Sequence, residues 1–290
     1  MPVAVITDSA AAVPAALAAA LGIHVVPMLL TVEGREWRDG DLPLEAVLAA
    51  RQVTTSGPTP AQVAEAIAAA DTGDGVVVCT VARTMSSTYD AARIAAEQAT
   101  AEVRVLDTQT AAGAEGLVVT HAARAAQRGE PLEAVIGAAR RVIERVRLVA
   151  TLDSLDRLVA SGRVPQVAAW AGRLLHVHPL FEFRAGAVRR LRPAFTRDAA
   201  LERVLSAWRR SRPEGPGAPA LHVAALHALD PPDAEHLLAR VREEVEPASA
   251  FVGAFSAVMV AHTGPGLVGL AWWWDETAAP PGSAGGAVGT

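Results

Sequence analysis

One histidine stands where binding or catalysis could occur. His262 lies in the stretch AHTGPG, between an apolar run and a loop rich in glycine and proline. The preceding run, FSAVMVA, is rich in residues that favour strands, and it predicts a buried strand that ends at His262. Side chains at strand ends are the ones that meet ligands in α/β folds. His262 is therefore a candidate binding residue, with Thr263 and Gly264 beside it.

Two loops rich in hydroxyl groups could hold an anion. In TTSGPTPAQVAEAIAAA, Thr55 and Ser56 lie just before Thr59, a predicted helix N-cap. In ARTMSSTYDAARIAA, Ser86 and Ser87 lie at the start of a second predicted helix. Helix N-termini carry partial positive charge and unpaired N–H donors, so each junction suits a small anion without any lysine or arginine. Each loop also has the simpler interpretation of an ordinary helix cap.

Further polar side chains are expected at strand ends. Asp8 and Ser9 end the first predicted strand, Asp107 ends another in VRVLDTQT, and His227 ends a later one in AALHALD. Carboxylates in such positions bind substrate or metal, and they also cap the helix that follows. For Asp107 the two interpretations have equal weight, and His227 could line a cleft.

Metal, redox and familiar nucleotide chemistry lack support. The single cysteine, Cys79, lies in the apolar run GVVVCTV and reads as a core residue. His176 and His178 have a spacing that would place them on one face of a strand, but no further ligand stands nearby, so we expect a packed or edge-strand pair and no metal site. The phosphate loop, the dinucleotide fingerprint, the zinc-protease motif and the hydrolase elbow are all missing.

The composition predicts a soluble cytoplasmic protein. The 290 residues carry a formal net charge of -5 with scattered arginines, which argues against a nucleic-acid surface. Hydrophobic residues make up 51%, yet no apolar run is long enough to cross a bilayer and no secretion signal opens the chain, so no stable membrane insertion is expected. Trp272, Trp273 and Trp274 are expected in a packed final strand rather than in a patch that contacts membranes.

Alternating strand-like and helix-like segments indicate an α/β protein of two domains. The runs VAVIT, IHVVPMLLTV, GVVVCTV, EVRVLD and RLVATL predict a mostly parallel sheet in a domain over 1–149. A second α/β domain is predicted over 150–276, with a helix that stops at Gly162, a hairpin that turns at residues 184–186, and final strands FSAVMVAHT and GLVGLAWWW. The tail, 277–290, is expected to be disordered.

Placed in order, these loops resemble the DegV family of bacterial proteins. The similarity covers nearly the whole chain, through ITDSAAAVP, VVPMLLTVEGREWRDGD, TTSGPTP, RTMSSTYDAA, VLDTQTAAGAEG, LDRLVASGRVP, HVHPLFEFRAGAV, LHALD and HTGPGLVGLAWW. The resemblance implies a two-domain α/β protein with its ligand in the cleft between the domains. It also implies a fatty-acid-binding subunit of fatty acid kinase that serves phospholipid synthesis, with no cofactor and no enzymatic activity of its own.

The resemblance also assigns site residues. It implies that the fatty-acid carboxylate is held by Thr55 with Ser56, by Ser86 and by His262, with Ser87 and Thr263 adjoining. The acyl chain would enter an apolar tunnel between the domains, for which VVPMLL and HPLFEF could supply side chains. A separate catalytic kinase subunit would phosphorylate the carboxylate. Asp8, Ser9, Asp107, Arg197, His227 and Gly264 are candidates for cleft or partner contacts.

This chain departs from the family pattern in several places. Ser87 replaces a usual glycine, and Gly57 stands where glutamine is common. In the stretch AFTRDAAL, Arg197 matches the second of two usual arginines, Phe195 replaces the first and Asp198 replaces a lysine. Because that stretch could help a kinase reach the carboxylate, these changes bear on partner recognition.

Two other functions stay open at this stage. A hydrolase could use Ser86 as nucleophile and His262 as base, oriented by Asp8 or Asp107. A carrier could instead hold another amphipathic carboxylate, such as a branched or polyketide-like acid. The residues alone do not fix the chain length of the ligand.

Overall fold

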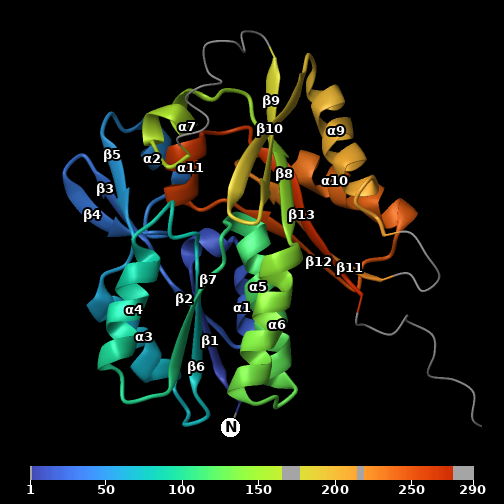
Figure 1. The fold of residues 1–290 in the computed structure, drawn as a ribbon. Coiled ribbons are helices and arrows are strands. Elements are labelled where there is room, and N and C mark those ends of the chain that lie inside the picture. Colours follow the sequence, from blue (N-terminus) through green and yellow to red (C-terminus); the bar gives the residue numbers. More distant parts are fainter. Residues whose placement is uncertain (1, 165–176, 214–218, 277–290) are drawn as a thin grey trace, which may run out of the picture.

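The computed structural model describes residues 2–164, 177–213 and 219–276. The predicted disorder of 277–290 and the placement of His176 lie outside the described residues. Within them the chain forms the mixed α/β architecture that the sequence predicts, with a four-stranded, a three-stranded and a six-stranded sheet (Figure 1).

The four-stranded sheet is wholly parallel and holds the early strands. Its order is β2 (Ile23–Val26), β1 (Ala4–Asp8), β6 (Val76–Thr80) and β7 (Val103–Asp107). All five residues of β1 and of β6 are buried, as expected for central strands of a sheet with helices on both faces. A 3-10 turn, η1 (Ser9–Ala11), follows β1 directly.

A small antiparallel sheet extends from this region. It consists of β4 (Arg35–Arg38), β3 (Leu29–Val32) and β5 (Val53–Ser56). The run IHVVPMLLTV therefore contributes to two sheets, β2 in one and β3 in the other. The chain divides at Val26, and Met28 begins the segment that crosses to the second sheet.

The six-stranded sheet draws its strands from Arg147 onward. The run RLVATL, expected in the parallel sheet, therefore lies in this one, where it pairs antiparallel with both neighbours. The strand order is β10 (Ala187–Ala194), β9 (His178–Arg184), β8 (Arg147–Thr151), β13 (Val268–Asp275), β11 (Ala220–His227) and β12 (Ser249–Ala254). The predicted hairpin is confirmed, because β9 and β10 pair antiparallel around Ala185 and Gly186. Trp272, Trp273 and Trp274 are buried in β13, so they are packed and not exposed.

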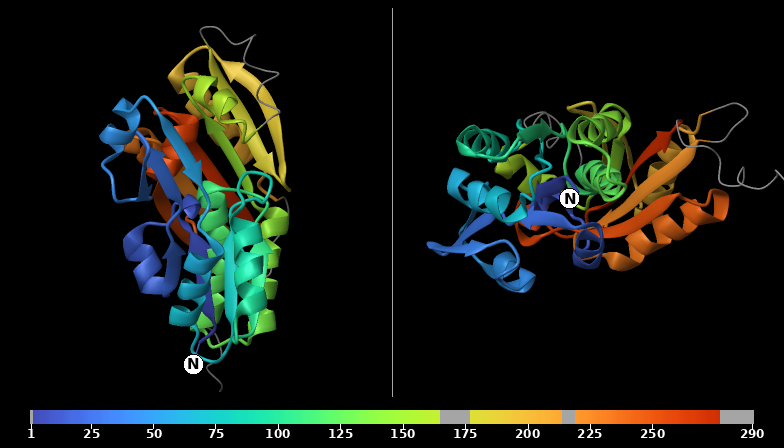
Figure 2. Two further views of the ribbon diagram at one scale, coloured as in Figure 1. Left: turned by 90° about the vertical axis from the view of Figure 1, so that its left-hand side faces the viewer. Right: turned by 90° about the horizontal axis from the view of Figure 1, so that it is seen from below.

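The helices and sheets form layers. Helices α3 (Pro60–Ala70) and α4 (Thr88–Gln98) cover one face of the four-stranded sheet, and α5 (Ala112–Gln127) and α6 (Leu132–Arg145) cover the other. Beyond α5 lies the six-stranded sheet, whose outer face carries α9 (Arg197–Arg209) and α10 (Pro231–Glu244) (Figure 2). The short helices are α1 (Ala15–Leu21), α2 (Leu44–Ala49), α7 (Asp156–Ser161) and α11 (Ala257–Thr263).

Small residues let α5 lie between two sheets. Thirteen of its residues are buried, and it contacts both β1 and β11. A Cβ on Gly113 would come within 2.4 Å of Leu226 in β11, and one on Gly116 within 2.6 Å of the Ala11 carbonyl oxygen. One hydrophobic cluster therefore includes residues from both predicted domains. The division at residue 149 stays a prediction.

The predicted strand that ends at His262 is wrong. The segment forms helix α11, in which Val258, Met259, His262 and Thr263 line one side, the spacing of a helix face. Two tertiary features favour the helix over local strand propensity: the Asp39 carboxylate accepts a hydrogen bond from Val258 N at 3.2 Å, and Gly264 ends the helix with a φ of +74°. The strand of this region is β12, which the sequence analysis missed.

Candidate ligand-binding site

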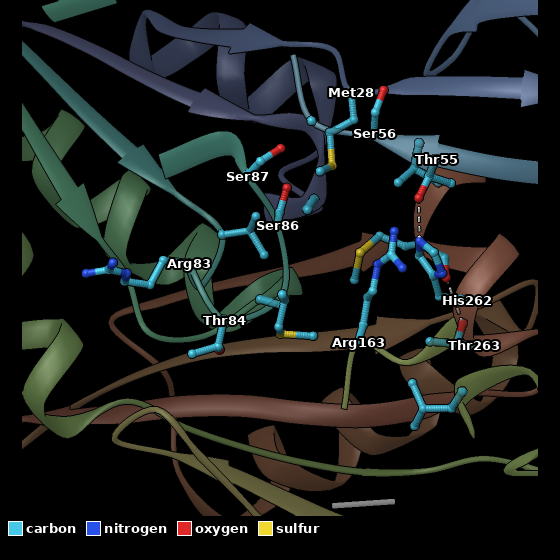
Figure 3. A pocket seen from close by; sticks show the side chains of 18 of the residues that line it. Met28, Thr55, Ser56, Arg83, Thr84, Ser86, Ser87, Arg163, His262 and Thr263 are labelled. Carbon is cyan, nitrogen blue, oxygen red and sulfur yellow. Dashed lines mark hydrogen bonds between the residues drawn. The ribbon is translucent and has the colours of Figure 1, made fainter. Parts of the chain in front are cut away.

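A cavity of about 550 Å³ lies where the three loops meet. Its size falls in the range of small-molecule sites. All six carboxylate-binding candidates from the sequence line it, from β5, from the loop before α4 and from α11 (Figure 3). They are Thr55, Ser56, Ser86, Ser87, His262 and Thr263.

The polar centre of the cavity is a contact between two segments far apart in the sequence. Thr55 Oγ1 at the end of β5 and His262 Nε2 in α11 lie 2.6 Å apart. The Thr263 hydroxyl donates to its own helix, to the carbonyl oxygen of Met259 at 3.1 Å. The Thr55–His262 bond thus joins the three-stranded sheet to the helix and fixes the ring at the cavity wall (Figure 3).

The imidazole of His262 is neutral at pH 7. Burial, and secondly the positive charge of Arg163, lower its pKa to about 4. A neutral ring carries a single N–H, so if Nε2 accepts the hydrogen bond from Thr55, Nδ1 can donate one to a ligand. Figure 3 shows the Arg163 side chain reaching toward His262 and Thr55, whereas Arg83 points away from them.

The loop that carries Ser86 and Ser87 (the serine loop) closely approaches the segment from Thr55 to Gly57 (the threonine loop). Ser86 Oγ lies 2.8 Å from Thr88 Oγ1 and accepts a hydrogen bond from Thr88 N at 3.3 Å. Ser87 is exposed and, at the N-cap of α4, makes no capping hydrogen bond. A Cβ on Gly57 would lie 2.8 Å from Thr88 Oγ1 and 3.2 Å from Ser86 Oγ. Glycine at position 57 therefore allows the two loops to meet.

The start of α3 is closed by its own side chains. Thr59 and Gln62 form a complete capping box, in which Gln62 N donates to Thr59 Oγ1 and Thr59 N donates to Gln62 Oε1. The predicted N-cap is thus confirmed, but Thr55 and Ser56 belong to β5 and not to the helix end. The hydroxyl groups themselves, rather than the α3 N-terminus, supply polar contacts on this side.

Asp39 connects helix α11 to Ser9, which follows strand β1. Its carboxylate accepts hydrogen bonds from the Ser9 hydroxyl at 2.6 Å and from Val258 N in α11 at 3.2 Å. Ser9 Oγ in turn accepts from Met28 N at 3.1 Å. Ser9, a predicted cleft residue, therefore acts behind the wall, where it helps Asp39 hold α11 and its histidine.

Two carboxyl groups are buried at the end of β1. Asp8 accepts hydrogen bonds at 2.9 Å from Ala10 N and from Val81 N, and both of those residues line the cavity. Burial raises the pKa of Asp8 to about 6. Glu115 accepts from Thr7 Oγ1 at 3.1 Å, and its complete burial holds its pKa well above the usual range. Asp8 thus ties the ends of β1 and β6 together under the site.

Arg197 lies outside the cavity lining and is a structural centre. Its guanidinium donates to Asp153, Asp230 and Asp233 and to the carbonyl oxygen of Gly266 in the loop after α11. Only 22% of the side chain is exposed. Arg197 thereby anchors the loop that follows His262.

The other predicted cleft residues also lie outside the lining. Asp107 Oδ1 accepts from Arg83 N at 3.2 Å and from Gln109 N at 2.9 Å, so it acts as a turn cap at the end of β7. His227 is half-buried at the end of β11, and burial lowers its pKa. Gly264 ends α11.

A smaller, apolar cavity adjoins the first one, whose wall combines polar groups with apolar side chains such as Met28, Val81 and Val258. It measures about 50 Å³ and shares Met85, Ala111, Leu158, Met259 and Thr263 with the larger cavity. Its remaining walls are apolar: they come from β8, β9, β10, the start of α5, and the residues Val164, Phe255 and Leu267. Met28 and the pair Phe181 and Phe183 belong to the stretches VVPMLL and HPLFEF, which the sequence analysis associated with a tunnel. Flexible methionines at the shared boundary can adapt to a ligand.

Sequence reasoning missed Arg163, Asp39 and Glu115. Arg163 directly follows the helix stop at Gly162. A lone arginine between a helix end and a proline was the sequence feature that could have marked it as a site residue. Asp39 stands in the quoted stretch EGREWRDGD, but its partner Val258 lies 219 residues away. Glu115 sits in an alanine-rich helix, and its complete burial has no local signature.

The geometry does not favour the hydrolase. A nucleophile and its base need to be within hydrogen-bond reach. In the part of the chain that the structure describes, the Ser86 hydroxyl is bonded to Thr88, and His262 Nε2 is bonded to Thr55. Asp8 and Asp107, the proposed orienting groups, are bonded to backbone N–H groups. The described residues contain no cluster of His, Cys, Asp and Glu suited to a metal ion.

The fold and the two cavities define a class of α/β protein in which a cavity lined by hydroxyl groups, a histidine and apolar side chains adjoins a smaller apolar cavity. The family described as "Uncharacterised protein, DegV family" matches residues 2–274, and the chain belongs to the DegV family. It is 33% identical over 291 residues to a DegV domain-containing protein of Mycobacterium tuberculosis, which covers 97% of this chain and 100% of that protein.

Solved structures of the family share this fold. A DegV family protein from Thermus thermophilus, described by its fatty acid binding, superposes with a TM-score of 0.86 at 26% identity and covers 94% of this chain and 100% of its own. A DegV lipid-binding protein from Thermotoga maritima gives a TM-score of 0.84 at 25% identity, with 94% of this chain and 99% of its own covered. No helix among the described residues has the length and apolar character to span a membrane.

Proposed function

We propose that this protein binds a long-chain fatty acid and presents its carboxylate to a separate kinase subunit. The observation that carries the proposal is a cavity that joins Thr55, Ser86 and His262 with apolar side chains and adjoins a second cavity whose wall is almost wholly apolar. An amphipathic carboxylate matches this division. The relatives that bind fatty acids support the choice of a fatty acid over other such acids.

The acyl tail and the carboxylate of the fatty acid contribute differently to the free energy of binding. Each buried CH₂ group contributes about 0.8 kcal/mol, so the tail supplies most of the affinity. The carboxylate needs charge-assisted hydrogen bonds to leave water. The Ser86 hydroxyl can donate one, and the Thr55–His262 pair can donate another, because their mutual bond uses one of the pair's two hydrogens. The positive charge of Arg163 at the same wall favours the ionised head group.

The reaction itself would take place on the bound ligand. A carboxylate oxygen attacks the γ-phosphorus of ATP held by the partner, the bond between that phosphorus and the bridging oxygen breaks, and ADP leaves. The product is an acyl phosphate that stays in the pocket for lipid synthesis. This chain contributes binding and orientation, and an ATP-dependent partner implies a cytoplasmic setting.

The test is to extract the purified protein with organic solvent and to identify the extract by mass spectrometry. We expect about one fatty acid per chain, and its loss in His262→Ala. A protein that carries none and takes up none from solution would contradict the proposal. Acyl phosphate formed with ATP and a candidate kinase subunit, trapped as a hydroxamate, tests the second half.

A further inference from the structure

The strand register orders the walls of the apolar cavity by their distance from the polar site. The loop after His262 leads into β13, whose Val268 pairs with Thr151 at the near end of β8. Farther along β8, Ala150 stands opposite Phe181, and farther still Leu148 stands opposite Phe183. The Phe183 row is therefore two residues, or about 7 Å, more distant than the Phe181 row.

The distant row spans three strands. Phe183 pairs with Leu148 of β8 on one side and with Val188 of β10 on the other, and all three line the apolar cavity. Phe183 and Leu148 are buried, and Val188 is half-buried. The residues that follow in the hairpin, 184–187, are exposed. On β9 and β10 the row is thus the last apolar layer before the exposed hairpin turn.

We infer that Phe183, with Leu148 and Val188, forms the end wall of the acyl chamber and sets the longest chain that the protein accepts. This inference rests on the proposed function and adds a determinant of specificity to it. Phe183 is the largest side chain of the row and stands at its centre, so it decides how far a tail can extend. Thr55 and His262 are not among the residues that line this cavity.

The test compares the bound fatty acids of four proteins by native mass spectrometry after incubation with an equimolar mixture of saturated acids of roughly twelve to twenty carbons. Phe183→Ala should shift the preferred acid upward by about two to four carbons, the room that the lost ring frees. Val188→Phe should shift it downward. Leu180→Ala is the matched control, because Leu180 is equally buried on β9 but packs on the opposite face of the sheet.

The outcomes separate the two proposals. Opposite shifts in Phe183→Ala and Val188→Phe, with the wild-type preference kept in Leu180→Ala, support the end wall. If both cavity variants keep the wild-type preference for chain length, the end wall is overturned while fatty-acid binding stands. If Leu180→Ala shifts the preferred chain length as much as Phe183→Ala does, the end wall is also overturned, because the shift then reflects a general loosening of the core. If wild type retains no acid from the mixture, the proposed function fails and the wall fails with it. Val188→Phe keeps the test decisive should Phe183→Ala not fold.

Discussion

Thr55 and His262 form the contact on which the polar end of the site depends. The bond of 2.6 Å orients the ring and leaves its other nitrogen for a ligand. The two residues lie 207 positions apart, so only the tertiary fold brings them together. Their types and their likeness to a family motif were readable from the sequence, whereas the bond between them was not.

Thr55→Val should weaken fatty-acid binding by about tenfold, because valine keeps the shape of threonine but removes the hydroxyl that bonds the His262 ring and orients it. The measurement is a titration with a fluorescent fatty acid. Thr54→Val is the control, since Thr54 is the exposed neighbour on β5 and does not line the cavity. Equal affinities for wild type and Thr55→Val would remove Thr55 from the site.

Gly57→Ala should push the threonine and serine loops apart and weaken binding several-fold. The new Cβ would lie 2.8 Å from Thr88 Oγ1, closer than side chains tolerate. Gly137→Ala in α6 is the control, because a Cβ there meets nothing nearer than 3.8 Å, and alanine should raise the free energy of unfolding by up to about 1 kcal/mol. Unchanged affinity in Gly57→Ala would show that the loops can separate without loss.

At the scale of elements, local signals were predictable and long-range ones were not. The Thr59 cap, the helix stop at Gly162 and the β9–β10 hairpin depend on residues within a few positions of one another, and the structure confirms them. Helix α11 depends on the distant Asp39 carboxylate, and its valines and methionine fit a strand as well as a helix. The hydrophobic period alone cannot distinguish a helix from a strand in a segment of seven residues.

Asp39→Ala should lower both binding and stability, because α11 loses the hydrogen bond from Val258 N and Ser9 loses its acceptor. Bonds to a charged acceptor are worth about 1.5–3 kcal/mol each, so we expect a loss of a few kcal/mol in the free energy of unfolding. Urea denaturation measures it. Asp41→Ala is the control, since the Asp41 carboxylate accepts only an exposed bond at 3.3 Å from Arg38 N. A loss of the same size in both variants would contradict a special role for Asp39.

For the whole molecule, α5 is the element that both large sheets share. Its far side carries His121, which packs at 4.8 Å between ring centroids against Trp273 of β13, and His222 of β11 stacks on the same indole at 4.7 Å. Burial lowers the pKa of both imidazoles to about 4. The contact between the layers therefore contains two neutral histidines.

Stability should consequently fall in acid. In the unfolded chain each histidine takes up a proton near pH 6.5 and in the folded protein only near pH 4, so the unfolded state binds more protons between these values and the free energy of unfolding decreases as pH falls through them. Asp8 has the opposite effect on the free energy of unfolding. Its pKa is raised to about 6 in the folded protein, so its burial destabilises the fold least in acid, where the carboxyl group is protonated.

Comparison of wild type with His222→Asn isolates the histidine contribution, because the acidic groups are common to both proteins. The free energy of unfolding of His222→Asn should depend less steeply on pH between 6.5 and 4, by roughly 2 kcal/mol over the interval. Asparagine can retain a hydrogen bond to Ser249, which lies 2.7 Å from His222 Nδ1. Parallel pH curves would assign the acid sensitivity elsewhere.

Cys79 lies at the centre of the parallel sheet, fully buried in β6 between β1 and β7. It is the only cysteine of the chain, and burial, with the nearby carboxyl groups of Glu115 and Asp8, raises its pKa far above that of a free thiol. Thiol reagents attack the thiolate, so they can modify this protein only when the sheet opens. The rate of modification by a thiol reagent is therefore a direct clock for opening of the core, and it needs no engineered label.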